Sequence, residues 1–475
     1  MFKLSKSHLL LFLIVVFSFL YRVFLMLWGS YPPGADIGLH NSIIHSITQS
    51  GNTNFYWNYY HMGSGVSLTF PGYHIFVSYI ILMTGLPDAL AHALVVSLFS
   101  SLIVAVAFLI TKKVWGGTAA LIAALLVAFS RFDIEMLMWG GYPNAVALML
   151  IPLTFYLFLQ REKFSLLCFV VVTSLLSGAI FLTHSLSAVI FVGITFSTFV
   201  IGTVFSSRFG VRRSYFFIWL LPLILGAVII SPFLVAGLPV FLGSYTGAFT
   251  GGVSDIRLAL LSTQTLTLDY VLPLLLCIFI IFLLSKKYHG KFFSVSALLL
   301  SMWILIPAIG TQGYLVGFYT DYSRFKYFVY LPVIITLGLV IDFASNFLAK
   351  GTELLLSKIK TLPQIGAGIK RKLSRLRRLR LLSTRKPIYV LLVTIFTIYS
   401  LFSVSIFVMP SDSINIPNFY QVMNDQLYQG IQWARNYTPA DSVFVGDALY
   451  GWWFSGFAQR QTLSASDPQY LILPR

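Results

Sequence analysis

The sequence predicts an all-α membrane protein that crosses the bilayer about eleven times. Of its 475 residues, 57% are hydrophobic and only 10% are charged, against roughly 25% charged residues in a soluble domain. The mean hydropathy is +0.84. Apolar runs that are long enough to cross, or nearly so, lie at 8–28, 88–111, 117–132, 144–160, 164–183, 186–206, 215–237, 269–285, 293–309, 328–349 and 388–409.

Basic residues predict how these spans are oriented. Lys and Arg number 32 against 15 Asp and Glu. If the amino terminus is cytoplasmic, every strongly basic loop falls on the cytoplasmic side, as the positive-inside rule requires. These loops contain Lys112–Lys113, Arg161–Lys163, Arg208–Arg213, Lys286–Lys291 and the run 350–387. We therefore predict a multi-pass plasma-membrane protein with a cytoplasmic N-terminus and an exoplasmic C-terminus.

The most basic segment is the loop 350–387, with twelve Lys or Arg residues and one acid between Lys350 and Lys386. Its position after a long apolar run makes anionic membrane lipids the expected partner, rather than nucleic acid. The sequence has no Walker motif, dinucleotide fingerprint, HExxH or GxSxG motif. Their absence argues against ATP-driven transport, redox chemistry and the common protease classes.

The segment 70–86 is apolar but is not expected to cross the membrane. Counting it as a span would place Lys112–Lys113 on the exoplasmic side, so we interpret it as an interfacial or re-entrant helix. It closes the first exoplasmic loop, 29–87. The transmembrane module is expected at 1–409. Residues 410–475 are expected to form a small exoplasmic α/β segment, because a helical pattern is followed there by a short strand-like run.

Asp36 and His40 are the first candidates for chemistry. They follow the first span in the stretch YPPGADIGLH, and an acid beside a membrane is costly enough to suggest a function. Four residues apart, they lie one turn apart on a helix and could share a substrate or a metal ion. The alternative is that Asp36 only caps a helix that begins near Ile37.

A second group of candidate substrate-binding residues lies near other exoplasmic span ends. Asp133 and Glu135 follow the third span, and His184 follows the fifth. We expect the two acids to form a cluster facing Asp36, so that Asp36, Asp133 and Glu135 are the candidate ligands of a divalent cation, Mg²⁺ or Mn²⁺. The alternatives are interfacial acids among belt aromatics and a histidine that is merely hydrogen-bonded at a helix end.

The segment GFYTDYSRFKYF at 317–328 contains the candidate substrate-binding residues Tyr322, Arg324 and Lys326. Two cations at the exoplasmic surface run against the positive-inside tendency. A lipid phosphate or pyrophosphate would explain them. The alternative is that they pair with Asp321 in the same segment.

Together these features resemble the GT-C integral-membrane glycosyltransferases of archaea and bacteria. That superfamily includes oligosaccharyltransferases, protein O-mannosyltransferases and aminoarabinose transferases. Members carry a DD, DE or DxD-type motif in the first loop, of which this sequence retains Asp36. The tail 433–465 is similar to the entry into the soluble domain of archaeal oligosaccharyltransferases. Their Trp-Trp-Asp motif appears here as Tyr450-Gly451-Trp452-Trp453-Phe454, without the acid, which argues against sequon-recognising transfer.

The resemblance implies transfer of one sugar, with inversion, from a polyprenyl- or dolichyl-phosphate donor to an acceptor glycan, lipid or protein. Asp36, with His40 nearby, would be the catalytic base, and Arg324 and Lys326 would stabilise the departing phosphate. Three alternatives remain: en bloc transfer of a whole glycan, a transporter of lipid-linked sugars, and a non-catalytic scaffold.

Overall fold

The computed structural model describes residues 6–51, 70–235, 268–289, 294–312, 323–361, 385–408, 422–446 and 448–462. Within these ranges the protein is almost entirely helical. Seven helices are long and apolar enough to cross a membrane: α1, α4, α7, α8, α9 and the central parts of α16 and α19. Three shorter apolar helices, α3, α11 and α15, accompany them. The protein is therefore a multi-pass membrane protein, and the number of about eleven spans stays a prediction.

The helices in the first half of the chain are α1 (Lys6–Met26), α2 (Ile37–Ser50), α3 (Gly72–Thr84), α4 (Asp88–Trp115), α5 (Gly117–Ala128), α6 (Arg131–Trp139), α7 (Tyr142–Leu159), α8 (Leu166–Thr183), α9 (Ser185–Val204), α10 (Ser206–Phe209) and α11 (Arg213–Ile229). The second half contains α14 (Leu268–His289), α15 (Val295–Gly310), α16 (Ser323–Thr361), α19 (Arg385–Val408), α20 (Asp425–Tyr437) and α21 (Ala448–Trp453). A π-helical turn, η3 (Phe454–Ala458), and two-residue strands β1 (Val443–Phe444) and β2 (Gln461–Thr462) complete the described C-terminal part.

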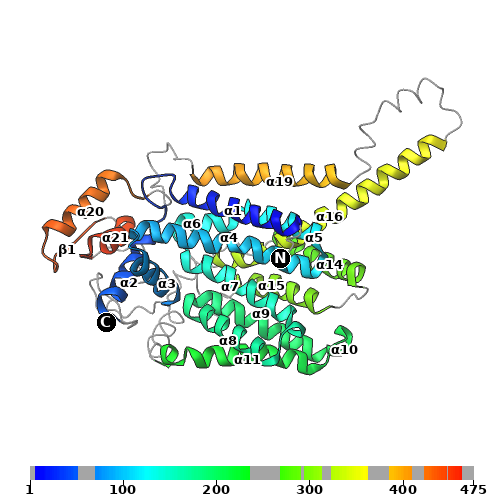
Figure 1. The fold of residues 1–475 in the computed structure, drawn as a ribbon, viewed down its shortest axis with the longest axis horizontal. Helices are drawn as coiled ribbons and strands as arrows, with labels where there is room; N and C mark the ends of the chain where they lie inside the picture. The colour runs from blue at the N-terminus through cyan, green and yellow to red at the C-terminus, as the bar shows by residue number, and fades with distance from the viewer. Residues whose placement is uncertain are drawn as a thin grey trace, which may run out of the picture.

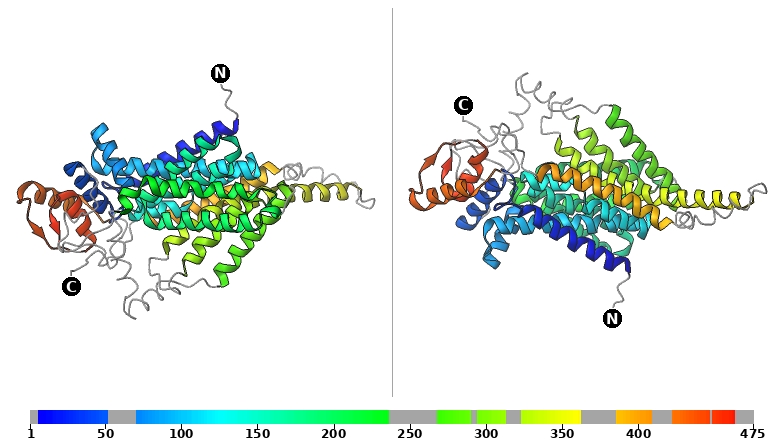
Figure 2. Two further views of the ribbon diagram at one scale, coloured as in Figure 1. Left: turned by 90° about the horizontal axis from the view of Figure 1, so that it is seen from below. Right: turned by 90° about the horizontal axis from the view of Figure 1, so that it is seen from above.

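The two ends of the helical bundle differ in composition. Figures 1 and 2 show α2, α3, α20 and α21 gathered at one end, while α16 projects from the other. The basic loops lie at the end from which α16 projects. In the loop after α4, Lys112 Nζ is 2.9 Å from His8 Nε2, near the start of α1. The Tyr215 hydroxyl near the start of α11 likewise donates to the carbonyl of Phe158 near the end of α7, at 3.4 Å. The described parts of the basic loops therefore share one end of the bundle, although 362–384 of the most basic run lie outside the described residues.

The segment predicted to be interfacial forms the 13-residue helix α3. A helix needs about 20 residues to span a bilayer, so α3 is too short to cross in a straight line. It begins after Pro71 and ends at Gly85, whose left-handed backbone (φ 67°) stops the helix. The short length agrees with the prediction that this segment does not cross.

The predicted third span, 117–132, is a broken helix. α5 ends at Ala128, and α6 begins after Ser130, whose hydroxyl accepts from the Phe132 N–H. The break exposes backbone groups in the interior, and the guanidinium of Arg22 in α1 donates to the carbonyl of Ala128 at 3.1 Å. A break inside a membrane bundle is tolerated where other protein groups satisfy the backbone in this way. The run predicted as the third span is therefore divided between α5 and α6, and that it crosses the membrane stays a prediction.

The C-terminal segment is attached to the first loop of the bundle. A Cβ on Gly38 of α2 would lie 2.1 Å from the carbonyl oxygen of Trp452, and a Cβ on Gly456 would lie 2.1 Å from that of Gly38. Glycine at both positions lets the two backbones touch. β1 and β2 pair in parallel, with Val443 opposite Gln461. Residues 409–421, around the predicted domain boundary, lie outside the described residues.

Candidate active site

Two glycines allow the loop that carries Asp36 to pack closely against the turn between α6 and α7. Gly34 and Gly140 both have positive φ, 100° and 99°. A Cβ on Gly34 would lie 2.6 Å from the backbone carbon of Trp139, and one on Gly140 would lie 2.8 Å from Cβ of Asp36. Side chains are excluded at both positions by space and by backbone conformation. This contact fixes Asp36 beside the beginning of α7.

Asp36 occupies the N-cap position of α2, but its carboxylate does not cap that helix. Its backbone is helical (φ −73°, ψ −12°) and the side chain accepts no hydrogen bond from the first turn. The alternative in which Asp36 serves only as a cap is therefore contradicted. The side chain is half-buried and lies within electrostatic reach of the buried Tyr142 hydroxyl. That hydroxyl donates to the carbonyl of Pro33 at 3.4 Å.

His40 lies one turn after Asp36, with both ring nitrogens in use. Nε2 is 2.8 Å from the Gly140 carbonyl, which can only accept, so Nε2 carries the proton. Nδ1 is 3.0 Å from Nε2 of His74 in α3. Burial lowers the pKa of His40 to about 4, so the ring is neutral at pH 7. These contacts favour a role in holding the Gly140 turn, and the catalytic role of His40 stays a prediction.

A layer of histidine and tyrosine side chains that was not predicted from the sequence lies beneath this loop. The Tyr73 hydroxyl of α3 is 2.7 Å from Nδ1 of His92 in α4, and the His40 ring lies against both rings. Nearby, Nε2 of His45 is 2.9 Å from a carboxylate oxygen of Asp88. An ionisable residue within an apolar run, such as His92, was the signal that could have found this layer.

Arg324 and His184 come to the same end of the bundle from distant parts of the chain. The Arg324 guanidinium lies 5.2 Å from the centre of the Trp139 ring, next to Gly140. Burial, and then the positive charges of Arg324 and His40, lower the pKa of His184 to about 3. His184 is therefore within electrostatic reach of both side chains and is neutral at pH 7. Lys326 is half-buried on the same helix as Arg324, and Tyr322 lies outside the described residues.

Asp133 does not face Asp36. Its Oδ2 forms a fully buried ion pair with Arg22 at 2.6 Å and accepts from the Ser100 hydroxyl at 2.7 Å. Residues two apart on a helix point to different sides, so Glu135 of α6 does not share the side of Asp133. It pairs with Arg131 at 3.6 Å. Burial raises the pKa of Glu135. The expectation that these two acids form a cluster facing Asp36 is therefore not met.

The three acids proposed as metal ligands are likewise not gathered at one point. Within the described ranges no group of three or more His, Cys, Asp or Glu side chains is placed to hold an ion. Asp133 is already neutralised by Arg22. The divalent cation stays a prediction.

The tryptophan pair of the C-terminal segment has a packing role. Trp452 and Trp453 are 1% and 0% exposed. The Trp453 indole N–H donates to the carbonyl of Gly34 at 3.0 Å, and its ring lies across from Tyr31. The pair thus supports the loop that carries Asp36. Arg460, close to it in sequence, donates to the carbonyls of Arg435 and Thr438, both at 2.7 Å.

Comparison with known proteins identifies the family. A family model described as "Family of unknown function (DUF6541)" matches residues 4–467. The chain belongs to this family. No curated protein sequence matches it.

Solved structures with the same fold include membrane glycosyltransferases. The Archaeoglobus fulgidus oligosaccharyltransferase in its apo form superimposes with a TM-score of 0.59 at 14% identity, covering 96% of this chain and 64% of that one. Its complex with an inhibitory peptide and a dolichol-phosphate gives 0.54 at 15% identity, with the same coverage. ArnT from Cupriavidus metallidurans bound to undecaprenyl phosphate gives 0.58 at 13% identity, covering 97% of this chain and 86% of that one.

The resemblance to GT-C proteins is thus confirmed at the level of the fold. This chain covers 64% of the length of the oligosaccharyltransferase and 86% of the length of ArnT. Identities this low show a shared fold and do not transfer an activity.

Proposed function

We propose that this protein is an inverting membrane glycosyltransferase. It moves one sugar from a polyprenyl-phosphate donor to a hydroxyl group of an acceptor glycan, lipid or protein. The observation that carries the proposal is the state of Asp36: a half-buried carboxylate, held in place by the Gly34 and Gly140 contacts, that does not cap its own helix. The carboxylate of Asp133, by contrast, is fully buried in an ion pair with Arg22.

In the proposed reaction Asp36 is the general base. It takes the proton from the acceptor hydroxyl as that oxygen attacks the anomeric carbon of the sugar. The bond between the anomeric carbon and the donor phosphate oxygen breaks, and its electron pair leaves with the phosphate. The products are the glycosylated acceptor, with inverted anomeric configuration, and polyprenyl phosphate.

Arg324 and Lys326 are proposed to bind the donor phosphate and to stabilise the charge that develops on it. The Arg324 guanidinium lies over the Trp139 ring. Trp139 immediately precedes Gly140, which contacts Asp36. Guanidinium groups bind phosphate oxygens with two parallel hydrogen bonds. His184, neutral at pH 7, adds no positive charge beside Arg324 and leaves that guanidinium as the cation for the leaving group.

The fold neighbours support the choice of donor. Two solved structures with this fold contain a lipid phosphate: dolichol-phosphate in the archaeal oligosaccharyltransferase and undecaprenyl phosphate in ArnT. A chain that shares their bundle and has cations at the end of the bundle beside Asp36 is suited to the same class of ligand.

Asp36→Asn tests the proposal. The change removes the base but nearly preserves its shape, so transfer should fall by about 10²- to 10⁴-fold, with unchanged expression and unfolding temperature. Transfer is followed as release of lipid phosphate from a panel of radiolabelled polyprenyl-phosphate hexoses in membranes that contain the full-length protein. Asp441→Asn is the matched control, because Asp441 is exposed in the C-terminal segment. Retained transfer by the Asp36 variant would end the assignment of the base.

The same assay separates the alternatives. En bloc transfer predicts activity with lipid-linked oligosaccharides and none with single-sugar donors. A transporter or scaffold predicts no release of lipid phosphate by the unmodified protein under any of these conditions. The stereochemistry of the product, read by NMR, tests the predicted inversion.

A further inference from the structure

An apolar cavity lies among α9, α14 and α15, toward the end of the bundle that carries the basic loops. Its volume is about 320 Å³, within the roughly 300–1,000 Å³ range of small-molecule sites. Leu298, Met302 and Leu305 line it from α15, and their spacing of four and three residues places them on one face of that helix. The Ser285 hydroxyl, near the basic end of α14, donates to the Ser294 hydroxyl just before α15 at 2.7 Å. The described lining residues do not include any residue of the candidate active site.

The cavity opens on the outer surface of the bundle. Phe205, which follows α9 and lines the cavity, is 49% exposed. Val204 and Leu283 each adjoin a lining residue in the sequence, and they are 62% and 45% exposed. In a membrane-spanning bundle such apolar outer surface is in contact with lipid tails. Acyl chains of the bilayer therefore reach the cavity without crossing the protein.

The chemistry of the lining decides what fills this space. Apart from Arg208 and Ser301, the described residues that line the cavity are all apolar. Ordered water needs several polar partners, which such a lining does not provide. An empty cavity would leave its wall atoms without the dispersion contacts that a filled one supplies. An acyl chain from the surrounding bilayer restores those contacts.

Arg208 sets the charge of the group that this chain carries. It is the one charged residue among the described residues that line the cavity. It is exposed in the short helix α10, directly after α9, and no described carboxylate forms an ion pair with it. Guanidinium groups bind phosphate oxygens with two parallel hydrogen bonds. A ligand with an apolar chain and a phosphate at its end therefore matches both parts of the lining.

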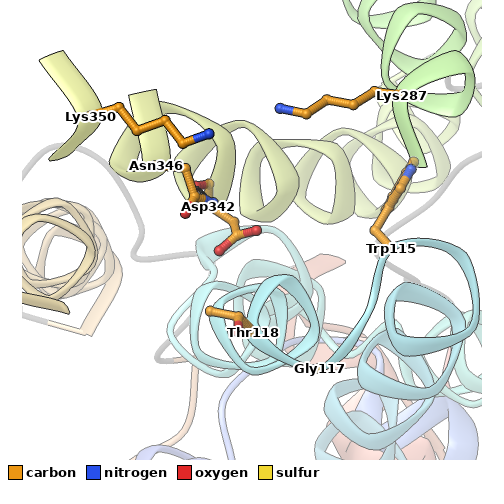
Figure 3. A pocket seen from close by; sticks show the side chains of 7 residues that line it. All are labelled: Trp115, Gly117, Thr118, Lys287, Asp342, Asn346 and Lys350. Atoms are coloured by element: carbon orange, nitrogen blue, oxygen red, sulfur yellow. Dashed lines mark hydrogen bonds between the residues drawn. The ribbon is translucent and has the colours of Figure 1, made fainter. Parts of the chain in front are cut away.

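A polar cavity elsewhere in the bundle provides a contrast. It is shown in Figure 3, and Lys287, Asp342 and Lys350 are among the residues that line it. Because charges of both signs line the polar cavity, its lining does not select a ligand by the sign of its charge. The described lining of the apolar cavity has one sign only, and a positive charge favours an anion.

We propose that the apolar cavity binds an acyl chain of an anionic phospholipid such as phosphatidylglycerol, and that Arg208 binds the phosphate of that lipid. The chain contributes shape and packing but little selectivity, because the lipid tails of the bilayer are as apolar as the cavity wall. Selectivity comes from the headgroup, since a basic residue near the membrane surface favours anionic lipids. The site is separate from the proposed glycosyl transfer and stands without it.

A photoactivatable lipid locates the occupant. The full-length protein in nanodiscs is illuminated with phosphatidylglycerol that carries a diazirine in one acyl chain, and labelled peptides are identified by mass spectrometry. The α15 peptide that contains Leu298 and Leu305 should be labelled. Unlabelled phosphatidylglycerol should displace this label at a concentration about fivefold lower than phosphatidylcholine with identical chains. An unlabelled α15 peptide, or equal displacement by the two lipids, would overturn the proposal.

A substitution of the cation tests the headgroup contact. Arg208→Gln should abolish the preference for phosphatidylglycerol over phosphatidylcholine, because the glutamine amide carries no charge. Arg212→Gln is the matched control, since Arg212 is also exposed in the same basic loop but does not line the cavity. A preference that survives Arg208→Gln, or that the two variants lose equally, would refute the role of Arg208.

A larger side chain in the cavity tests the acyl chain. Leu305→Trp should remove the label from α15, because the indole occupies the space of the chain. Leu283→Trp is the control, since Leu283 is exposed on α14 and does not line the cavity. A retained label in a Leu305 variant that unfolds at the normal temperature would refute the site, and the Arg208 comparison does not depend on this variant. Oleate that displaces the label as well as phosphatidylglycerol does would overturn the phospholipid in favour of a free fatty acid.

Discussion

Asp36 and Asp133 are both acids next to an apolar run, yet the structure gives them opposite environments. Asp133 is 0% exposed, and its charge is balanced by Arg22 at 2.6 Å. Asp36 is half-buried in a loop fixed by glycine contacts, and its carboxylate does not cap α2. From the sequence, the two acids were expected to form one cluster.

The difference shows how the two uses of a membrane acid can be told apart. A buried carboxylate with a dedicated arginine stabilises the bundle, here at the break between α5 and α6, where Arg22 also binds the Ala128 carbonyl. A half-buried carboxylate that is held in place by its loop and does not cap its helix is suited to accept a proton. The comparison therefore predicts that one acid matters for folding and the other for chemistry.

The largest expected effect comes from breaking the buried pair. Asp133→Asn leaves Arg22 charged and without its carboxylate, which should lower the free energy of unfolding by about 3–5 kcal/mol. Equilibrium unfolding in mixed detergent–denaturant solution measures it. Replacing both partners together, Arg22→Met with Asp133→Leu, should restore much of this loss, because no isolated charge remains. Asp36→Asn is the control and should unfold like the unmodified protein. An Asp133 variant of normal stability would show that the two acids do not differ in this way.

The second expected effect concerns the phosphate side of the proposed site. Arg324→Gln removes a charged contact of about 1.5–3 kcal/mol, so affinity for polyprenyl phosphate should fall about ten- to hundredfold. Binding is measured with the protein in nanodiscs. Arg131→Gln makes the same chemical change in an arginine that pairs with Glu135 and should leave affinity unchanged. If both variants bind the lipid normally, Arg324 does not hold the donor.

The smallest expected effect is a pH dependence of stability from His40. Its pKa is lowered to about 4 in the folded protein by burial, against about 6.5 when unfolded. The unfolded chain therefore binds more protons below pH 6.5, and stability falls as the pH falls toward 4. Between pH 6.5 and 5 this amounts to about 2 kcal/mol.

His40→Gln should reduce that dependence, because the glutamine amide can donate to the Gly140 carbonyl without titrating. Unfolding midpoints of both proteins at several pH values measure the difference. Parallel curves for the two proteins would contradict the assignment of the effect to His40.

Much of the architecture could be predicted from local properties of the sequence. Apolar length indicated a multi-pass helical protein, and the positions of Lys and Arg indicated which loops share one end of the bundle. Pro71 and Gly85 mark the limits of the short helix α3. Glycine and proline act within a few residues and apolar length acts within one helix, so these features can be inferred from the sequence.

Other features depended on contacts between distant segments. Arg22 interrupts the first apolar run, and its partner lies 111 residues later in the chain. His40, His74 and His92 meet only when α2, α3 and α4 pack, and His184 meets Arg324 only when α16 lies beside them. Neither hydropathy nor spacing specifies such partners.

The sequence by itself determined that this chain forms a bundle with charges sorted to its two ends, because transfer into a membrane acts on each segment separately. The tertiary structure alone decided that Asp133 is paired with Arg22, because a charge is balanced through space by whichever side chain the packing brings to it.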